Sequence, residues 1–149
     1  MSYEFADGFK IRDQNAIHFL TFTIVDWVDL FSRKTYRDIF LNNLNYCRRQ
    51  KGLRVGAYVI MSNHVHLICQ STTGCLSDTV RDLKSYSTKL FIGAIQEQVE
   101  SRREWLLQKF RYHANGTNRN KEFKVWTGNN HPEEVHSGSF LLTKLNLYT

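Results

Sequence analysis

The feature that most constrains the fold of this chain is a pair of apolar runs joined by a short polar corner. Residues 57–69 read AYVIMSNHVHLIC, with the corner at Ser62 and Asn63 and with His64 and His66 opening the second run. Alternate side chains of a β-strand point to the same face, so both imidazoles are predicted to share one face, with Cα atoms roughly 6.6–7 Å apart. That spacing lets two rings converge on one divalent ion. The alternative to a metal site is that one histidine is hydrogen-bonded within the protein and the other is solvated.

Size and charge narrow the class of protein. A chain of 149 residues with 42% hydrophobic residues predicts one globular domain. A net charge of +6 favours an acidic partner, of which nucleic acid is the usual one, although acidic proteins and lipid surfaces stay open. The start of the chain lacks the pattern of a signal peptide, and its longest apolar run is far short of the ~20 residues that a bilayer demands. We therefore expect a cytoplasmic protein without a membrane partner.

Hydrophobic periodicity predicts an α+β fold. Strands are expected at residues 17–25, 53–61, 64–71 and 123–126, and helices at residues 34–50, 77–91, 101–113 and 137–149. Apart from the extra helices at 101–113 and 137–149, the order strand, helix, strand, strand, helix, strand is that of a split βαβ, ferredoxin-like sandwich. We expect an antiparallel sheet with its helices packed mainly on one face.

The histidine segment also resembles a known signature. The string MSNHVHL is similar to that of the IS200-like, single-tyrosine transposases of the REP-associated type, which are HUH endonucleases; Ser62 stands where many relatives have proline. The basic helix from residue 76 and the stretches 103–107 and 125–133 resemble the same family. The resemblance covers about residues 17–146, so one IS200-like transposase domain is expected over residues 1–149.

The resemblance implies a metal-assisted reaction on DNA. His64 and His66 would hold a divalent metal, Mg²⁺ or Mn²⁺, that polarises the scissile phosphate of hairpin-bearing single-stranded DNA. A tyrosine then attacks the phosphorus and leaves a 5′-phosphotyrosine link and a free 3′-hydroxyl. Imidazole suits Mn²⁺ better than Mg²⁺, and its binding should weaken as pH falls through the histidine pKa. The relatives also imply a homodimer.

At the nucleophile, this chain departs from the family. Relatives carry the tyrosine on the last helix, with a polar residue one turn later that completes the metal site and has no counterpart here. The chain ends KLNLYT, so Leu147 takes the tyrosine position and Tyr148 follows about 100° further round the helix. Tyr148 is the catalytic candidate, and the alternative is a packed tyrosine on the stripe of Leu141 and Leu145. A one-base insertion in the gene would explain this ending as a truncation within the C-terminal helix.

Basic residues supply the candidate DNA contacts. They are Arg81, Lys84 and Lys89 on the helix after the metal strand, and Arg48 and Arg49 near the second strand. Phosphate contacts from such side chains would make binding strongly salt-dependent. The alternative for each cluster is a plain solvated face.

Three functions are consistent with these patterns. The leading one is a DNA transposition protein that binds hairpin-bearing single-stranded DNA and, like intact relatives, cleaves and rejoins it. The second is a catalytically inactive DNA-binding remnant or regulator that lost its nucleophile by truncation or frameshift. The third is an RNA-binding ferredoxin-like domain with aromatic side chains on an open sheet face, against which the histidine pair argues.

Overall fold

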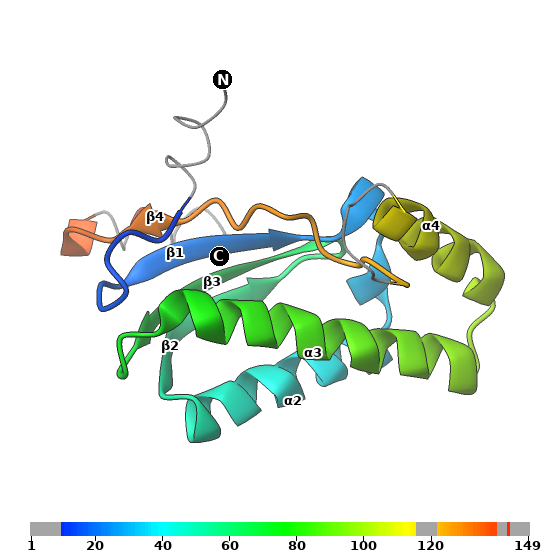
Figure 1. Cartoon of the computed structure of the whole chain (residues 1–149), viewed down its shortest axis with the longest axis horizontal. Helices are drawn as coiled ribbons and strands as arrows, with labels where there is room; N and C mark the ends of the chain where they lie inside the picture. Colours follow the sequence, from blue (N-terminus) through cyan, green and yellow to red (C-terminus); the bar gives the residue numbers. More distant parts are fainter. Residues whose placement is uncertain (1–9, 116–121, 140–142, 144–149) are drawn as a thin grey trace.

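A four-stranded antiparallel sheet forms the centre of the molecule. The computed structural model describes residues 10–115, 122–139 and 143. Its elements are β1 (His18–Thr23), the short 3-10 helices η1 (Val25–Trp27) and η2 (Leu30–Ser32), α2 (Lys34–Gln50), β2 (Leu53–Ile60), β3 (His64–Ser71), α3 (Leu76–Glu97), α4 (Arg103–Asn115) and β4 (Glu133–Glu134). The strand order is β2-β3-β1-β4, and α2 and α3 lie together on one side of the sheet (Figure 1). The predicted ferredoxin-like α+β sandwich is confirmed. None of the helices in the described part of the chain is long and apolar enough to cross a membrane.

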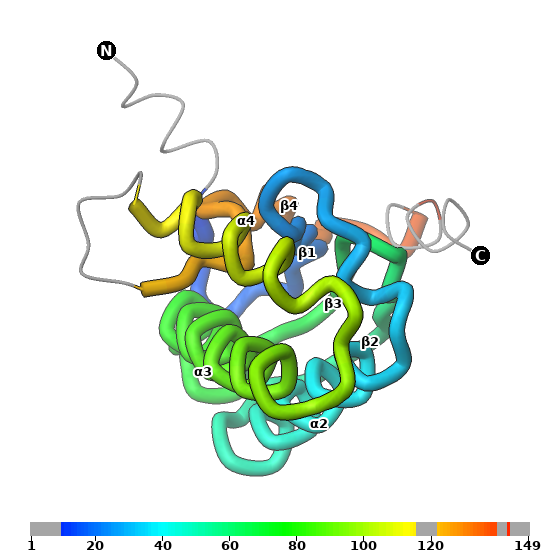
Figure 2. Tube along the Cα trace, turned by 90° about the vertical axis from the view of Figure 1, so that its right-hand side faces the viewer, coloured from blue at the N-terminus to red at the C-terminus, as the bar shows by residue number. Residues whose placement is uncertain are grey.

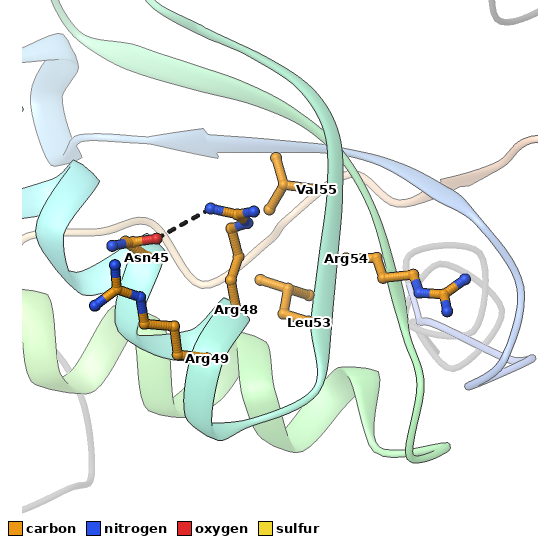
Figure 3. Close-up of a pocket in the computed structure, with 6 residues that line it drawn as sticks. All are labelled: Asn45, Arg48, Arg49, Leu53, Arg54 and Val55. Atoms are coloured by element: carbon orange, nitrogen blue, oxygen red, sulfur yellow. Dashed lines mark hydrogen bonds between the residues drawn. The ribbon is translucent and has the colours of Figure 1, made fainter.

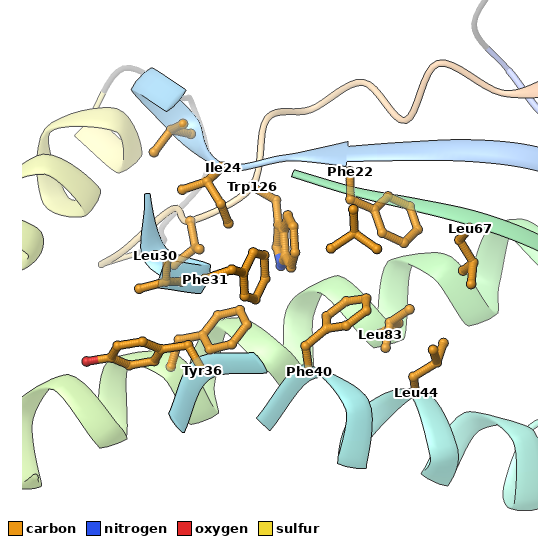
Figure 4. Packing of buried hydrophobic residues seen from close by; sticks show 14 of the residues in the cluster. Phe22, Ile24, Leu30, Phe31, Tyr36, Phe40, Leu44, Leu67, Leu83 and Trp126 are labelled. Carbon is orange, nitrogen blue, oxygen red and sulfur yellow. The ribbon is translucent and has the colours of Figure 1, made fainter. Parts of the chain in front are cut away.

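The core lies between the sheet and these two helices, and an indole sits at its centre. Trp126 is 3% exposed and packs among four phenylalanine rings, with centroid distances of 5.7–5.9 Å. Its Nε1 donates a hydrogen bond to Oγ of Ser87, 3.0 Å away on α3. Figure 4 shows Trp126 between strand and helix side chains. Sheet and helix layer are therefore joined through one residue from a segment that belongs to neither. The phenylalanines are Phe22, Phe31, Phe40 and Phe91.

The fourth strand lies later in the chain than predicted. Of the predicted strand 123–126, only Trp126 makes a bridge to the segment after β1, at Ile24. The amide of Lys124 instead donates to the carbonyl oxygen of Phe110 in α4. Regular pairing with β1 begins only at β4, just after Pro132, which has no N–H to donate to a strand ladder. The predicted strand was wrong because this segment first docks on α4.

The turn between α2 and β2 requires glycine. Gly52 has a φ of +66°, and a Cβ there would lie 2.5 Å from Oγ1 of Thr72. Gly52→Ala is expected to lower the free energy of unfolding by about 1–3 kcal/mol, measured by urea denaturation, because the left-handed backbone and the clash add. Gly93→Ala in α3 is the control, since nothing lies within 4 Å of its Cβ; it should leave stability unchanged or raise it by roughly 0.5–1 kcal/mol. Equal losses in the two variants would contradict this account.

The predicted last helix falls mostly outside the described residues. Gly138, Ser139 and Thr143 are helical, and Oγ1 of Thr143 donates to the carbonyl oxygen of Ser139, 2.9 Å away. These residues agree with a helix that begins near residue 137. Tyr148 lies outside the described residues.

Candidate metal centre

Both histidines lie on the face of the sheet opposite α2 and α3. Val65 and Leu67 between and after them are buried in the core, so the alternation of β3 turns His64 and His66 the other way. We call this side the histidine face; it carries the side chains of His64, His66, Ile68 and Gln70. The two imidazole centroids are 4.7 Å apart, with their planes at 81°. The predicted placement of both rings on one face is confirmed.

The corner before the pair is anchored by backbone hydrogen bonds. The carbonyl oxygen of Asn63 accepts from the amide of Ile24 at 3.0 Å, and that of Ser62 accepts from the amide of Phe31 at 2.9 Å. The corner is thus tied to the segment that leaves β1 and to η2. Because His64 follows directly, these bonds fix the position at which β3 begins.

A side-chain amide sets the protonation of His64. Nδ2 of Asn63 donates to the carbonyl oxygen of Trp27 at 3.4 Å, which turns Oδ1 toward the ring. Nδ1 of His64 lies 2.7 Å from that Oδ1. An amide oxygen only accepts, so Nδ1 carries the proton and Nε2 keeps its lone pair. Burial lowers the pKa of His64, which favours the neutral form that a metal requires.

His66 is held by contacts on two sides. It is 7% exposed and stacks on Phe19, with centroids 5.3 Å apart and planes at 18°. Thr21, its partner across the β1–β3 pairing, places Oγ1 3.0 Å from Nδ1 of the ring. Ring plane and ring rotation are therefore both constrained by β1.

This donor set fits part of a divalent metal site. Each Nδ1 is engaged by a neighbouring oxygen, the arrangement that orients imidazoles which bind metal through Nε2. Over the described ranges, no group of three or more His, Cys, Asp or Glu side chains is placed to hold a metal ion. Within the described residues, two imidazole nitrogens would therefore be what the protein offers such a site.

The candidate arginines of α2 lie away from this pair. Arg48 and Arg49 line a hollow between the end of α2 and the start of β2, where Nη1 of Arg48 donates to Oδ1 of Asn45 (Figure 3). That start of β2 pairs with the end of β3, whereas His64 opens β3. The structure therefore does not bring these two arginines to the histidines.

Arg54 lines the same hollow at the start of β2, but it differs from Arg48 and Arg49 in belonging to the histidine face of the sheet. It pairs with Gln70, which belongs to the histidine face. In Figure 3 its side chain points away from Arg48 and Arg49. The alternation of side chains along β2 gives Arg54 this orientation.

The candidates of α3 differ in their surroundings. Lys84 donates to the carbonyl oxygen of Thr127 at 2.8 Å and to Oδ1 of Asn130 at 2.7 Å, so its ammonium ties the segment before β4 to α3 instead of facing solvent as a DNA contact would. Arg81 lies 3.3 Å from carboxylate oxygens of Asp78 and Asp82. Lys89 is exposed. All three belong to the helix layer.

The residues that orient the histidines were not predicted from the sequence. Asn63 stands next to His64 in the motif, and its preference for corners was the available signal. Thr21 gave no local signal, because its contact depends on the register between β1 and β3.

Fold and site together define a ferredoxin-like domain with a His-x-His pair on a central strand. Residues 17–127, well over half of the chain, match the IS200-like transposases, and the chain belongs to this family. It is similar in structure to a REP-associated tyrosine transposase bound to a REP hairpin (TM-score 0.62, 13% identity, covering 93% of this chain and 67% of that one). It is also similar to a protein described as a transposase from Deinococcus radiodurans R1 (TM-score 0.55, 16% identity, covering 93% of each chain). Among curated proteins none matches significantly.

Proposed function

We propose that this protein acts in DNA transposition by binding hairpin-bearing single-stranded DNA and cleaving it at the histidine face. The observation that carries the proposal is the pair of imidazoles 4.7 Å apart, each with its Nδ1 engaged. Membership of the IS200-like family favours transposition over an inactive remnant or an RNA-binding domain. The hairpin bound to a structurally similar transposase supports the choice of substrate.

His64 and His66 are the proposed metal ligands. A bound Mg²⁺ or Mn²⁺ would neutralise charge on the scissile phosphate, and imidazole ligands favour Mn²⁺. Asn63 and Thr21 keep the two rings in place. The protein thus contributes a pair of imidazoles whose orientations are set in advance.

Tyr148 is the proposed nucleophile, on the resemblance of the chain's end to the family's last helix. Its Oη would form a bond to phosphorus while the bond from phosphorus to the 3′ oxygen breaks. The tyrosine proton leaves to solvent, and the departing oxygen takes up a proton. The products are a 5′-phosphotyrosine link and a free 3′-hydroxyl.

Arg54 is the best placed of the proposed phosphate contacts, because it shares the histidine face. Arg48, Arg49 and Lys89 would contact DNA that extends past the edge of the sheet toward the helices. Arg81 would do so only by leaving its aspartates. We also propose that the protein is cytoplasmic and forms a homodimer. Sedimentation would measure the dimer directly.

Binding of a labelled hairpin oligonucleotide in EDTA, followed by fluorescence anisotropy, tests this function. We expect the hairpin-bearing strand to bind at least about tenfold more tightly than an unstructured strand of equal length, with affinity falling steeply as salt rises. Arg54→Gln should reduce the salt slope by about one. Lys34→Gln, which changes an exposed cation paired with Asp38 on α2, should not. Absence of hairpin binding would overturn the proposal.

Thr21→Val should weaken Mn²⁺ binding about 10–100-fold in calorimetric titration, because loss of the hydroxyl frees the His66 ring to rotate. Thr23→Val is the matched control. Thr23 faces His64 in the same pairing, but the hydrogen bond of His64 goes to Asn63. Equal affinities in both variants would show that the Thr21 contact does not orient the ligand.

A further inference from the structure

An exposed tryptophan stands directly beside the histidine pair. The Trp27 side chain is 65% exposed, although a large aromatic residue ordinarily gains from burial. Its ring meets His64 edge to face, with centroids 6.2 Å apart and planes at 81°. Its carbonyl oxygen accepts from Nδ2 of Asn63, the amide that orients His64. Trp27 is therefore linked to the candidate ligand by both ring and backbone.

The turn that presents Trp27 is strained. Asp26 has a φ of +55° and Trp27 a φ of +54°, two successive left-handed residues with side chains. This conformation is costly outside glycine and persists where the surroundings hold it, often at functional positions. The strain gives the first sign that the position of this ring matters.

Helix α4 supplies the groups that hold the turn. Oδ2 of Asp26 lies 3.0 Å from Nε2 of His113 and 3.1 Å from Nζ of Lys109. His113 and then Lys109 lower the pKa of Asp26, so the carboxylate is charged at neutral pH. Figure 2 shows α4 alongside the segment that follows β1. A helix otherwise remote from the sheet thus fixes the position of the exposed indole.

We propose that Trp27 is a stacking platform for an unpaired base of the DNA strand whose phosphate lies at the histidine pair. Proteins that bind single strands without reading their sequence stack successive bases on exposed aromatic side chains. The ring centroids of Trp27 and His64 are 6.2 Å apart. A base could therefore stack on Trp27 while a phosphate of the same strand lies at His64. The inference rests on the proposed function, because it takes single-stranded DNA as the ligand.

Hairpin-DNA binding by Trp27 variants in EDTA tests the inference without a loaded metal site. Trp27→Ala should weaken binding about 5–100-fold, and Trp27→Phe, which keeps a stacking ring, should stay within about threefold of the unchanged protein. Tyr46→Ala is the matched control, since Tyr46 is a 52% exposed aromatic on α2, in the helix layer. Urea denaturation should give all variants the unchanged midpoint.

Tryptophan fluorescence supplies a second readout. In a Trp105→Phe background, emission comes from Trp27 and the buried Trp126, and DNA should quench the exposed one. If the protein without substitutions bound no single-stranded DNA, the proposed function itself would be wrong. Normal binding that Trp27→Ala leaves intact, without quenching, would overturn only the stacking role. If Trp27→Ala changed the oligomeric state seen in sedimentation but not the affinity for DNA, Trp27 would be a contact between protein chains. That result would also overturn the inference.

Discussion

Alanine at both His64 and His66 is expected to abolish binding of Mn²⁺, measured by isothermal titration near neutral pH. The apparent affinity should fall by at least about 100-fold, since even residues that merely orient ligands change metal affinity 10–100-fold. Both rings lie on one face with Nδ1 engaged, so they are the nitrogen donors that the described residues offer there. No further cluster of three ligating side chains in these ranges could replace them.

His136→Ala is the control for this loss. The His136 side chain is 76% exposed, and its Nδ1 lies 3.9 Å from a carboxylate oxygen of Glu134, far along the chain from the pair. This variant should bind Mn²⁺ like the unchanged protein. A double alanine variant that titrates normally would contradict the assignment of the metal centre.

Trp126→Ala is expected to produce the largest loss of stability. Removing an indole from a closely packed aromatic cluster costs about 3–5 kcal/mol, which lowers Tm by roughly 8–15 °C for a domain of this size. The lost side chain fills the space between sheet and helices, and its removal also leaves Ser87 without the indole donor. Urea denaturation and calorimetry would measure the change.

Trp105→Ala provides the matched comparison, because Trp105 is 45% exposed on α4. Its contact with the ammonium of Lys109, 5.8 Å from the ring centroid, contributes about 0.5–1 kcal/mol at an exposed site. Similar losses of stability in the two variants would show that Trp126 does not join the two layers.

Much of the fold was predictable because local periodicity carries it. The alternation in residues 53–61 and 64–71 predicted the hairpin, and helical spacing predicted α2 with the bounds that the structure gives it. The fourth strand was not predictable in this way. Its position depends on where Lys124 docks on α4 and on where β1 still has an open edge. Neither fact is encoded in a short window of sequence.

The residues of the candidate site likewise include some that local sequence predicts and some that it does not. Period-two alternation places His64 and His66 on one face from sequence alone, whereas the contact of Thr21 requires the register of two strands that lie 40 residues apart in the chain. Lys84 was predicted to contact DNA, because its acceptors, Thr127 and Asn130, come from a distant segment that the local sequence does not show. The exposure of Trp27 could not be predicted, because it depends on the left-handed turn at Asp26 and Trp27.

The most direct test of the account is an adduct assay with hairpin-bearing single-stranded DNA and Mn²⁺, resolved on a denaturing gel. We expect an SDS-resistant protein–DNA band that disappears in Tyr148→Phe and in the double alanine variant of His64 and His66. A band that survives loss of both histidines would contradict the metal centre. Tight DNA binding by the unchanged protein without any covalent band would contradict cleavage.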